Sequence, residues 1–102
     1  MNTQNNCTQQ IKQILIAVLG EELEQFDKHV PLKDIYGFRY DSMRVLECVG
    51  EIEEKIGVEI DLLNDDLVRT FESLATIDEL VQKKLADQQL LLAAFGRSKS
   101  NE

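Results

Sequence analysis

The stretch DSMRVLECVGEIEEKIG, residues 41–57, decides the fold expected of this chain. Its mostly apolar positions recur at the spacing of a helix that buries one side. They are Val45, Leu46, Val49, Ile52, Glu53 and Ile56. Ser42 can cap such a helix at its start, and Gly57 can end it. The stretch therefore predicts an amphipathic helix that packs against other elements of the chain.

Apolar residues at helical spacing also occur upstream and downstream of this stretch. The upstream helix has Asn6 or Thr8 as a candidate cap and Gly20 as its end, because glycine tolerates a left-handed C-terminal cap. Its buried face comprises Ile11, Ile14, Leu15, Val18 and Leu19. The downstream helix begins at Ser73 or at Thr76, the latter forming a capping box with Glu79. Its buried face comprises Leu74, Ile77, Leu80, Val81 and Leu85.

The segments between these helices are expected to be less regular. Residues 21–41 follow no single period and contain a proline and a glycine, so they predict a long loop that contributes to the core and can hold a helical turn. Val58 and Ile60 alternate like a strand that has no partner, and they predict a loop that plugs the core. Residues 62–69 predict a short third helix that opens on acidic residues. The expected fold is all-α, a four-helix bundle with a long first loop and a short third helix.

Composition narrows the range of functions. The chain has 102 residues, of which 43% are hydrophobic, and a formal net charge of −8. These values suit one soluble domain whose acidic surface repels nucleic acid and attracts basic protein patches. The first residues lack the pattern of a signal peptide, and the apolar runs are too short to span a bilayer. We expect a cytoplasmic monomer that binds no nucleic acid and does not insert into a membrane.

Residues that usually mark an enzyme site are scarce. With the single histidine His29 the chain cannot assemble a zinc site or a nucleophile–base–orienter triad in the usual way, so we interpret His29 as an ordinary loop residue. The five glycines are scattered and form no phosphate-binding loop. Residues 61–72 have the length of a calcium loop but carry Asp66 where glycine is needed. No catalytic residue and no metal ligand is therefore predicted.

The two cysteines are too few for a disulfide scaffold, so the environment of each is predicted separately. Cys48 falls within one turn of Val45 and Ile52, which predicts a semi-buried thiol in the core. Cys7 lies near the start of the chain and is expected to be free and exposed.

Carboxylates gather after Ser42. Glu47, Glu51 and Glu54 lie at i, i+4 and i+7, which places them on one ridge where like charges repel. Such a ridge is either a solvated face that keeps the protein soluble or a docking surface for basic partners. The pair formed by Asp41 and Ser42, taken alone, is explained by helix capping.

The order of these features resembles one family. Residues 41–60, DSMRVLECVGEIEEKIGVEI, resemble without gaps the recognition helix of acyl carrier proteins, with a D-S-[LM] motif, an apolar and acidic helix, and then Gly-Val/Ile-Glu-Ile. Residues 70–80, TFESLATIDEL, look like the turn and final helix of that family, and residues 32–35, LKDI, resemble the end of its first loop. The resemblance covers residues 11–85. It implies a carrier domain over residues 1–86 and an extension over residues 87–102 that is partly helical and then mobile.

The resemblance also implies a function. In that family the serine of the motif carries a 4′-phosphopantetheine arm from coenzyme A, and the thiol of the arm holds acyl groups as thioesters. Ser42 matches that serine. Asp41 matches the residue that assists the phosphopantetheinyl transferase, which adds the arm, and Met43, Glu47, Glu51 and Glu54 match the residues that meet basic patches on acyl-transferring, condensing and modifying enzymes.

The resemblance therefore implies a non-catalytic acyl carrier of fatty-acid, lipid or polyketide-type synthesis. An aminoacyl or peptidyl carrier and an unmodified helical adaptor for a basic partner are the alternatives. Some residues depart from the family pattern. Arg39 and Tyr40 stand where many members have a glycine and a small residue, Met43 replaces the commoner leucine, and Arg44 adds a positive charge.

Overall fold

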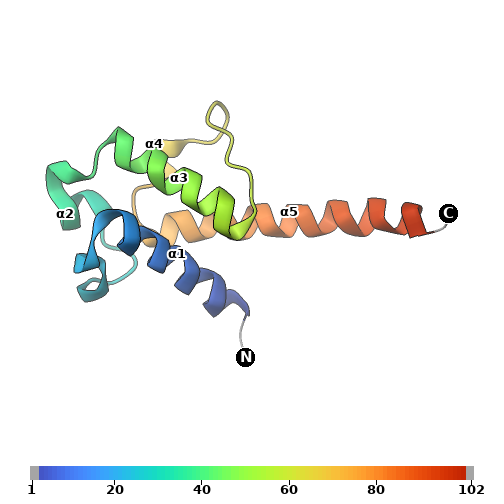
Figure 1. Cartoon of the computed structure of the whole chain (residues 1–102), viewed down its shortest axis with the longest axis horizontal. Helices are drawn as coiled ribbons and strands as arrows, with labels where there is room; N and C mark the ends of the chain where they lie inside the picture. Colours follow the sequence, from blue (N-terminus) through green and yellow to red (C-terminus); the bar gives the residue numbers. More distant parts are fainter. Residues whose placement is uncertain (1–2, 101–102) are drawn as a thin grey trace.

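The computed structural model describes residues 3–100, and their side chains from residue 7 to residue 94. Over these residues the fold is all-α, as predicted, and the only β-pairing is an isolated bridge between Pro31 and Ser73 (Figure 1). The elements in order are α1 Thr3–Leu19, η1 Glu21–Gln25, α2 Leu32–Tyr36, η2 Gly37–Arg39, α3 Ser42–Ile56, α4 Leu67–Thr70 and α5 Leu74–Ser100.

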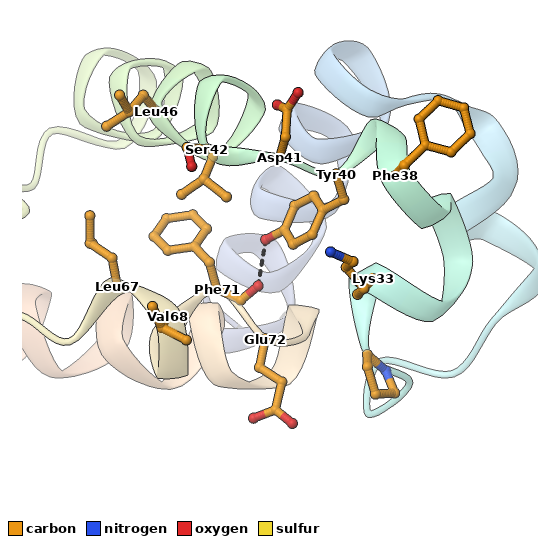
Figure 2. A pocket seen from close by; sticks show the side chains of 12 residues that line it. Lys33, Phe38, Tyr40, Asp41, Ser42, Leu46, Leu67, Val68, Phe71 and Glu72 are labelled. Carbon is orange, nitrogen blue, oxygen red and sulfur yellow. Dashed lines mark hydrogen bonds between the residues drawn. The ribbon is translucent and has the colours of Figure 1, made fainter.

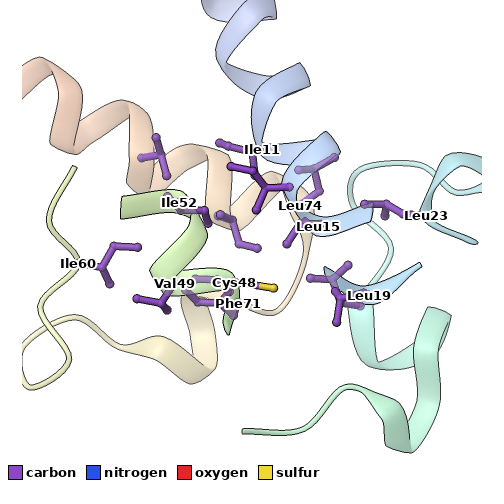
Figure 3. Packing of buried hydrophobic residues seen from close by; sticks show 14 of the residues in the cluster. Ile11, Leu15, Leu19, Leu23, Cys48, Val49, Ile52, Ile60, Phe71 and Leu74 are labelled. Atoms are coloured by element: carbon purple, nitrogen blue, oxygen red, sulfur yellow. The ribbon is translucent and has the colours of Figure 1, made fainter. Parts of the chain in front are cut away.

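The core lies where α1 packs against α3 and α5 (Figure 3). Each of these helices contributes most of the apolar stripe that its sequence pattern predicts, because residues three and four apart share one helical face. The most deeply buried side chains are Ile11, Leu15, Leu23, Leu32, Cys48, Ile52, Phe71, Ile77 and Val81. The prediction that Val58 and Ile60 plug the core is confirmed, because both side chains are buried in the same cluster.

Two expectations about side-chain burial are wrong. Leu46 was expected in the buried stripe of α3, but its side chain is 48% exposed because it lies at the edge of the packed face. Cys7 was expected to be exposed, yet it is buried. The physical reason is that α1 begins at Thr3, before the caps considered at Asn6 and Thr8, so Cys7 lies one helical turn before Ile11 on the same face.

The long segment between α1 and α3 holds three short helices, η1, α2 and η2, rather than the one helical turn considered above. Gly20 ends α1, and its φ of 131° is a value that favours glycine, although its ψ of 166° differs from that of a left-handed cap. The hydroxyl of Tyr36 donates to the Gly20 carbonyl at 2.8 Å, and the Leu32 N–H donates to the Glu72 carbonyl at 2.7 Å. These bonds fix the segment to the end of α1 and to the residues just before α5.

The helices after α3 begin on side-chain caps. Asp66 caps α4 by accepting from the Arg69 N–H at 3.3 Å, so the third helix is present but shorter than residues 62–69. At α5, Ser73 and Thr76 bond to each other: the Ser73 N–H donates to Thr76 Oγ1 at 2.9 Å, and the Thr76 N–H donates to Ser73 Oγ at 3.3 Å. The start at Ser73 is therefore the correct alternative.

Helix α5 continues well beyond the other elements (Figure 1). The molecule extends 54 Å along its longest axis, and its radius of gyration is 15.2 Å, compared with about 13 Å for a compact chain of this length. Residues 87–100 are thus helical. The boundary at residue 86 between a carrier domain and an extension stays a prediction. The predicted mobility of the last residues concerns side chains outside the described part of the chain. No helix within the described part of the chain has the length and apolar character needed to cross a lipid bilayer.

Candidate functional site

Ser42 is the first residue of α3, but it is not the cap of that helix. The cap is Asp41, whose Oδ1 accepts from the Arg44 N–H at 3.0 Å. The Ser42 side chain is exposed, and among the described residues no hydrogen bond to its hydroxyl occurs. The expectation that Ser42 caps the helix is therefore wrong, and the consequence is a serine hydroxyl that is free to react.

The backbone around Ser42 suits a negatively charged group. The first N–H groups of a helix have no intrahelical partner and lie at the positive end of the helix dipole. The Arg44 N–H is bonded to the Asp41 side chain, and the Val45 N–H is bonded to the Asp41 carbonyl at 3.0 Å. The N–H groups of Ser42 and Met43 remain, and they can donate to a phosphate attached at the adjacent hydroxyl.

A largely apolar groove of about 710 Å³ opens beside Ser42 (Figure 2). Its walls come from α3, α4 and the segment before α3. The apolar lining residues are Pro31, Phe38, Tyr40, Val45, Leu46, Leu67, Val68 and Phe71, and the polar ones are Lys33, Asp41, Ser42 and Glu72. The apolar stripes of the bundle predict a cavity for an acyl chain, but the sequence does not indicate that the groove lies at the surface beside α4. Apolar residues such as Val68, on a helix too short to bury them all, were the signal.

Tyr40 links the groove to the core through a hydrogen bond. Its buried hydroxyl donates a hydrogen bond to the Phe71 carbonyl, which joins the segment before α3 to the end of α4 (Figure 2). Burial raises the pKa of the Tyr40 phenol well above its ordinary value, so the hydroxyl keeps its proton and remains a donor. Tyr40, one of the departures from the family pattern, therefore has a structural role two residues before Ser42.

Replacing Tyr40 by phenylalanine is expected to lower the free energy of unfolding by about 1–3 kcal/mol, because the Phe71 carbonyl would lose its buried partner. Urea denaturation followed by circular dichroism measures this change. The exposed phenylalanine Phe38 offers a matched control, since Phe38→Leu removes no hydrogen bond and should leave the stability nearly unchanged. Equal stability of wild type and the Tyr40→Phe variant would contradict the role given to the hydroxyl.

The acidic ridge on α3 is partly neutralised by its own helix. Glu47 accepts from Arg44 at 2.7 Å, and Glu51 accepts from Lys55 at 2.6 Å. Within the described residues Glu54 has no such ion pair. The three carboxylates therefore repel one another less than their spacing alone implies. Together with the exposed Met43 they are spaced by four, four and three residues along α3, which begins at Ser42, so all the predicted partner-binding residues lie on one face of this helix.

Other chemistry-bearing residues lie apart from Ser42. His29 is exposed in a turn, and in residues 3–100 no cluster of three metal-ligating side chains occurs. Cys48 is fully buried in α3, and burial raises the pKa of its thiol to about 12. Its prediction as a core thiol is confirmed. The groups around Ser42 are thus a free hydroxyl, a helix N-terminus, an apolar groove and an acidic face.

Comparison with known proteins agrees with this geometry. The family model described as the phosphopantetheine attachment site matches residues 9–83. No curated protein and no solved structure was found to be similar to the chain.

Proposed function

We propose, since the chain belongs to the phosphopantetheine attachment-site family, that it is an acyl carrier protein whose arm is attached to Ser42. The domain of this family is the site of covalent 4′-phosphopantetheine attachment, so the cofactor of the chain is 4′-phosphopantetheine. The observation that carries the assignment to Ser42 is the exposed hydroxyl at the first residue of α3, left free because Asp41 provides the cap.

The residues around Ser42 fit a phosphodiester. The N–H groups of Ser42 and Met43 would hold its oxygens, and the dipole of the 15-residue helix α3 would favour its negative charge. When bound, the group supplies a thiol that carries acyl groups as thioesters. The protein's own part is to attach the arm, to cap the helix beneath it through Asp41 and to present a surface to other enzymes.

The groove beside Ser42 supports an apolar cargo. Its walls are mainly aromatic and aliphatic, and its volume of about 710 Å³ is within the range of ordinary ligand sites. A hydrocarbon chain would gain by leaving water there. This favours fatty-acid, lipid or polyketide-type acyl groups over the amino acids of an aminoacyl or peptidyl carrier.

The partners follow from the same proposal. A phosphopantetheinyl transferase would add the arm, with Asp41 assisting recognition, and acyl-transferring, condensing and modifying enzymes would dock through basic patches. Met43, Glu47, Glu51 and Glu54 would form the surface that they meet. The protein itself would be a non-catalytic carrier acting in the cytoplasm.

The test is the intact mass of the purified chain before and after incubation with coenzyme A, magnesium and a broad-specificity phosphopantetheinyl transferase. We expect a gain of one phosphopantetheine unit. Repeating the reaction with acyl-coenzyme A and aminoacyl-coenzyme A, followed by hydrolysis of each product, compares how well the two cargoes are protected. If a folded, unmodified sample gained no mass with two different transferases, the carrier function would be wrong and a helical adaptor would replace it.

Reversing charge on α3 should weaken this reaction. For the double variant Glu47→Lys/Glu51→Lys we expect a roughly tenfold lower kcat/KM of the transferase at low salt, because the encounter with a basic surface loses its electrostatic steering. The loss should shrink as salt is added. The matched control Glu24→Lys/Glu79→Lys changes the net charge by the same amount at exposed positions outside α3. Equal losses in both double variants would show that net charge, not this face, governs the encounter.

A further inference from the structure

The part of α5 beyond Gln88 extends past the bundle, and Leu91 borders the last hollow that the two share. Gln88 still donates from Nε2 to the Gly57 carbonyl at 3.1 Å, and Leu85 still packs against the core. The following side chains, residues 89–94, are all exposed, including those of Leu90, Leu91 and Leu92. We call residues 89–100 the free segment of α5.

The free segment is unusual for a helix in water. Residues 89–100 extend for roughly 18 Å at 1.5 Å per residue, and helices of this length without tertiary contacts are marginally stable. Three consecutive leucines point in three directions around the helix axis, since each residue is turned by about 100° from the last. A helix that is apolar on several sides is typical of one that is covered by other protein.

The two sides of α5 differ in what they contact. Val81, Leu85 and Gln88 face the bundle, and Leu92 continues their line. Leu90 lies two residues after Gln88 and therefore on the opposite side of the helix. The positions that share a helical face with Leu90 are Asp87, Ala94 and Arg97, at the spacing of three, four and three of the a and d positions of a coiled coil, and Asp87, at the edge of this face, also borders a hollow lined by Gly57. We call these four positions the outer face of α5.

We propose that the outer face of α5 pairs with the same face of a second copy of this chain, with the two helices antiparallel. In this register Leu90 lies opposite Ala94 of the second copy, and Asp87 lies opposite Arg97 of the second copy. Each contact occurs twice because the arrangement has two-fold symmetry. The small side chain at Ala94 lets the two helices approach closely around the leucines.

The charges at the two ends of the outer face favour a second copy of the chain as the partner, with the two helices antiparallel. Asp87 precedes the leucines, and Arg97 follows them, so an antiparallel pair places opposite charges together at both ends. A parallel pair would place like charges together. Among the described residues Asp87 has no ion pair within its own chain, although its side chain is exposed beside the bundle. A net charge of −8 otherwise opposes association of two copies.

The pairing leaves the attachment site accessible. Figure 1 shows α3 beginning near α2, at the end of the molecule away from the free segment of α5. Two copies joined through their outer faces would therefore present both Ser42 residues to other enzymes. Because the contact involves few residues, the dimer should be concentration-dependent rather than obligate.

The experiment is sedimentation equilibrium of the full chain over a range of concentrations at low salt. We expect a monomer–dimer equilibrium in the wild type. Leu90→Glu should raise the dissociation constant about tenfold or more, because it places a charge at the centre of the pair. Leu92→Glu is the matched control: the two leucines are 71% and 68% exposed, but Leu92 lies on the other side of the helix. It should leave the equilibrium unchanged.

Exchange of charge tests the orientation. Asp87→Arg and Arg97→Asp should each weaken self-association, because each opposes like charges at both ends of an antiparallel pair. An equimolar mixture of the two variants should form a mixed dimer, in which the opposing charges are again complementary. Circular dichroism of each variant checks that the helix content is retained. A wild-type chain that stays monomeric up to about 1 mM, a dimer that survives Leu90→Glu, or single charge variants that dimerise as well as the wild type would each overturn the proposal.

Discussion

Replacing Ser42 by alanine is expected to abolish the gain of one phosphopantetheine unit completely while leaving the fold intact. The hydroxyl is the atom to which the arm would be bonded, so no slower route through the same residue remains. Its removal should change the free energy of unfolding by less than about 0.5 kcal/mol, because the side chain is exposed and makes no hydrogen bond within the described residues.

The measurement is intact mass together with a thermal melt of the same sample. Ser98→Ala is the control, because it removes a serine hydroxyl from α5, far from α3 in the sequence, and it should keep the full mass gain. If Ser42→Ala still gained the mass, attachment at Ser42 would be refuted, and peptide mapping of the modified chain would identify the true site. If it lost the fold, the view of Ser42 as structurally dispensable would be wrong.

Replacing Phe71 by alanine is expected to lower the free energy of unfolding by about 3–5 kcal/mol. The Phe71 ring is only 2% exposed and belongs to the core cluster, so its removal leaves a cavity that the surrounding residues cannot fill. The loss would be a large part of the roughly 5–15 kcal/mol that stabilises a typical domain. Since Phe71 also lines the groove beside Ser42, the variant should protect a bound acyl chain less well.

Urea denaturation checks this expectation. Val68 lines the same groove but is 89% exposed, so Val68→Ala should cost less than about 0.5 kcal/mol. The contrast between the two variants separates packing in the core from simple loss of apolar surface in the groove. A cost below about 1 kcal/mol for Phe71→Ala would show that this end of the bundle relaxes around the missing ring.

The helices that form the core could be predicted because each carries its own periodic pattern. Ile11, Ile52 and Ile77 were all placed correctly on buried faces by spacing alone. Ser42 could be singled out through the motif that contains it and through the family that this motif resembles. The features that pattern analysis predicts well are therefore local, since they depend on residues within a few turns of one another.

The features that could not be predicted depend on contacts between distant segments. The groove needs α4 to lie beside the start of α3, and the hydrogen bond from Tyr40 to Phe71 joins residues 31 positions apart. The prediction that Ser42 caps α3 is wrong for a different reason, since the cap is its neighbour Asp41. Both residue types cap helices well, and only the backbone geometry decides which of two neighbours does so.

The burial of both cysteines has a consequence for the chemistry of the loaded carrier. Burial raises the pKa of the Cys7 thiol and of the Cys48 thiol, so both are less nucleophilic at neutral pH than an exposed cysteine. These are the only two cysteines of the chain. On the proposed function, an acyl group held on the arm would meet two buried thiols of low reactivity on its own protein, which disfavours its migration to a side chain. A thiol-specific label applied to the folded protein would then react mainly with the thiol of the arm, so the amount of label bound would report the fraction of chains that carry an arm.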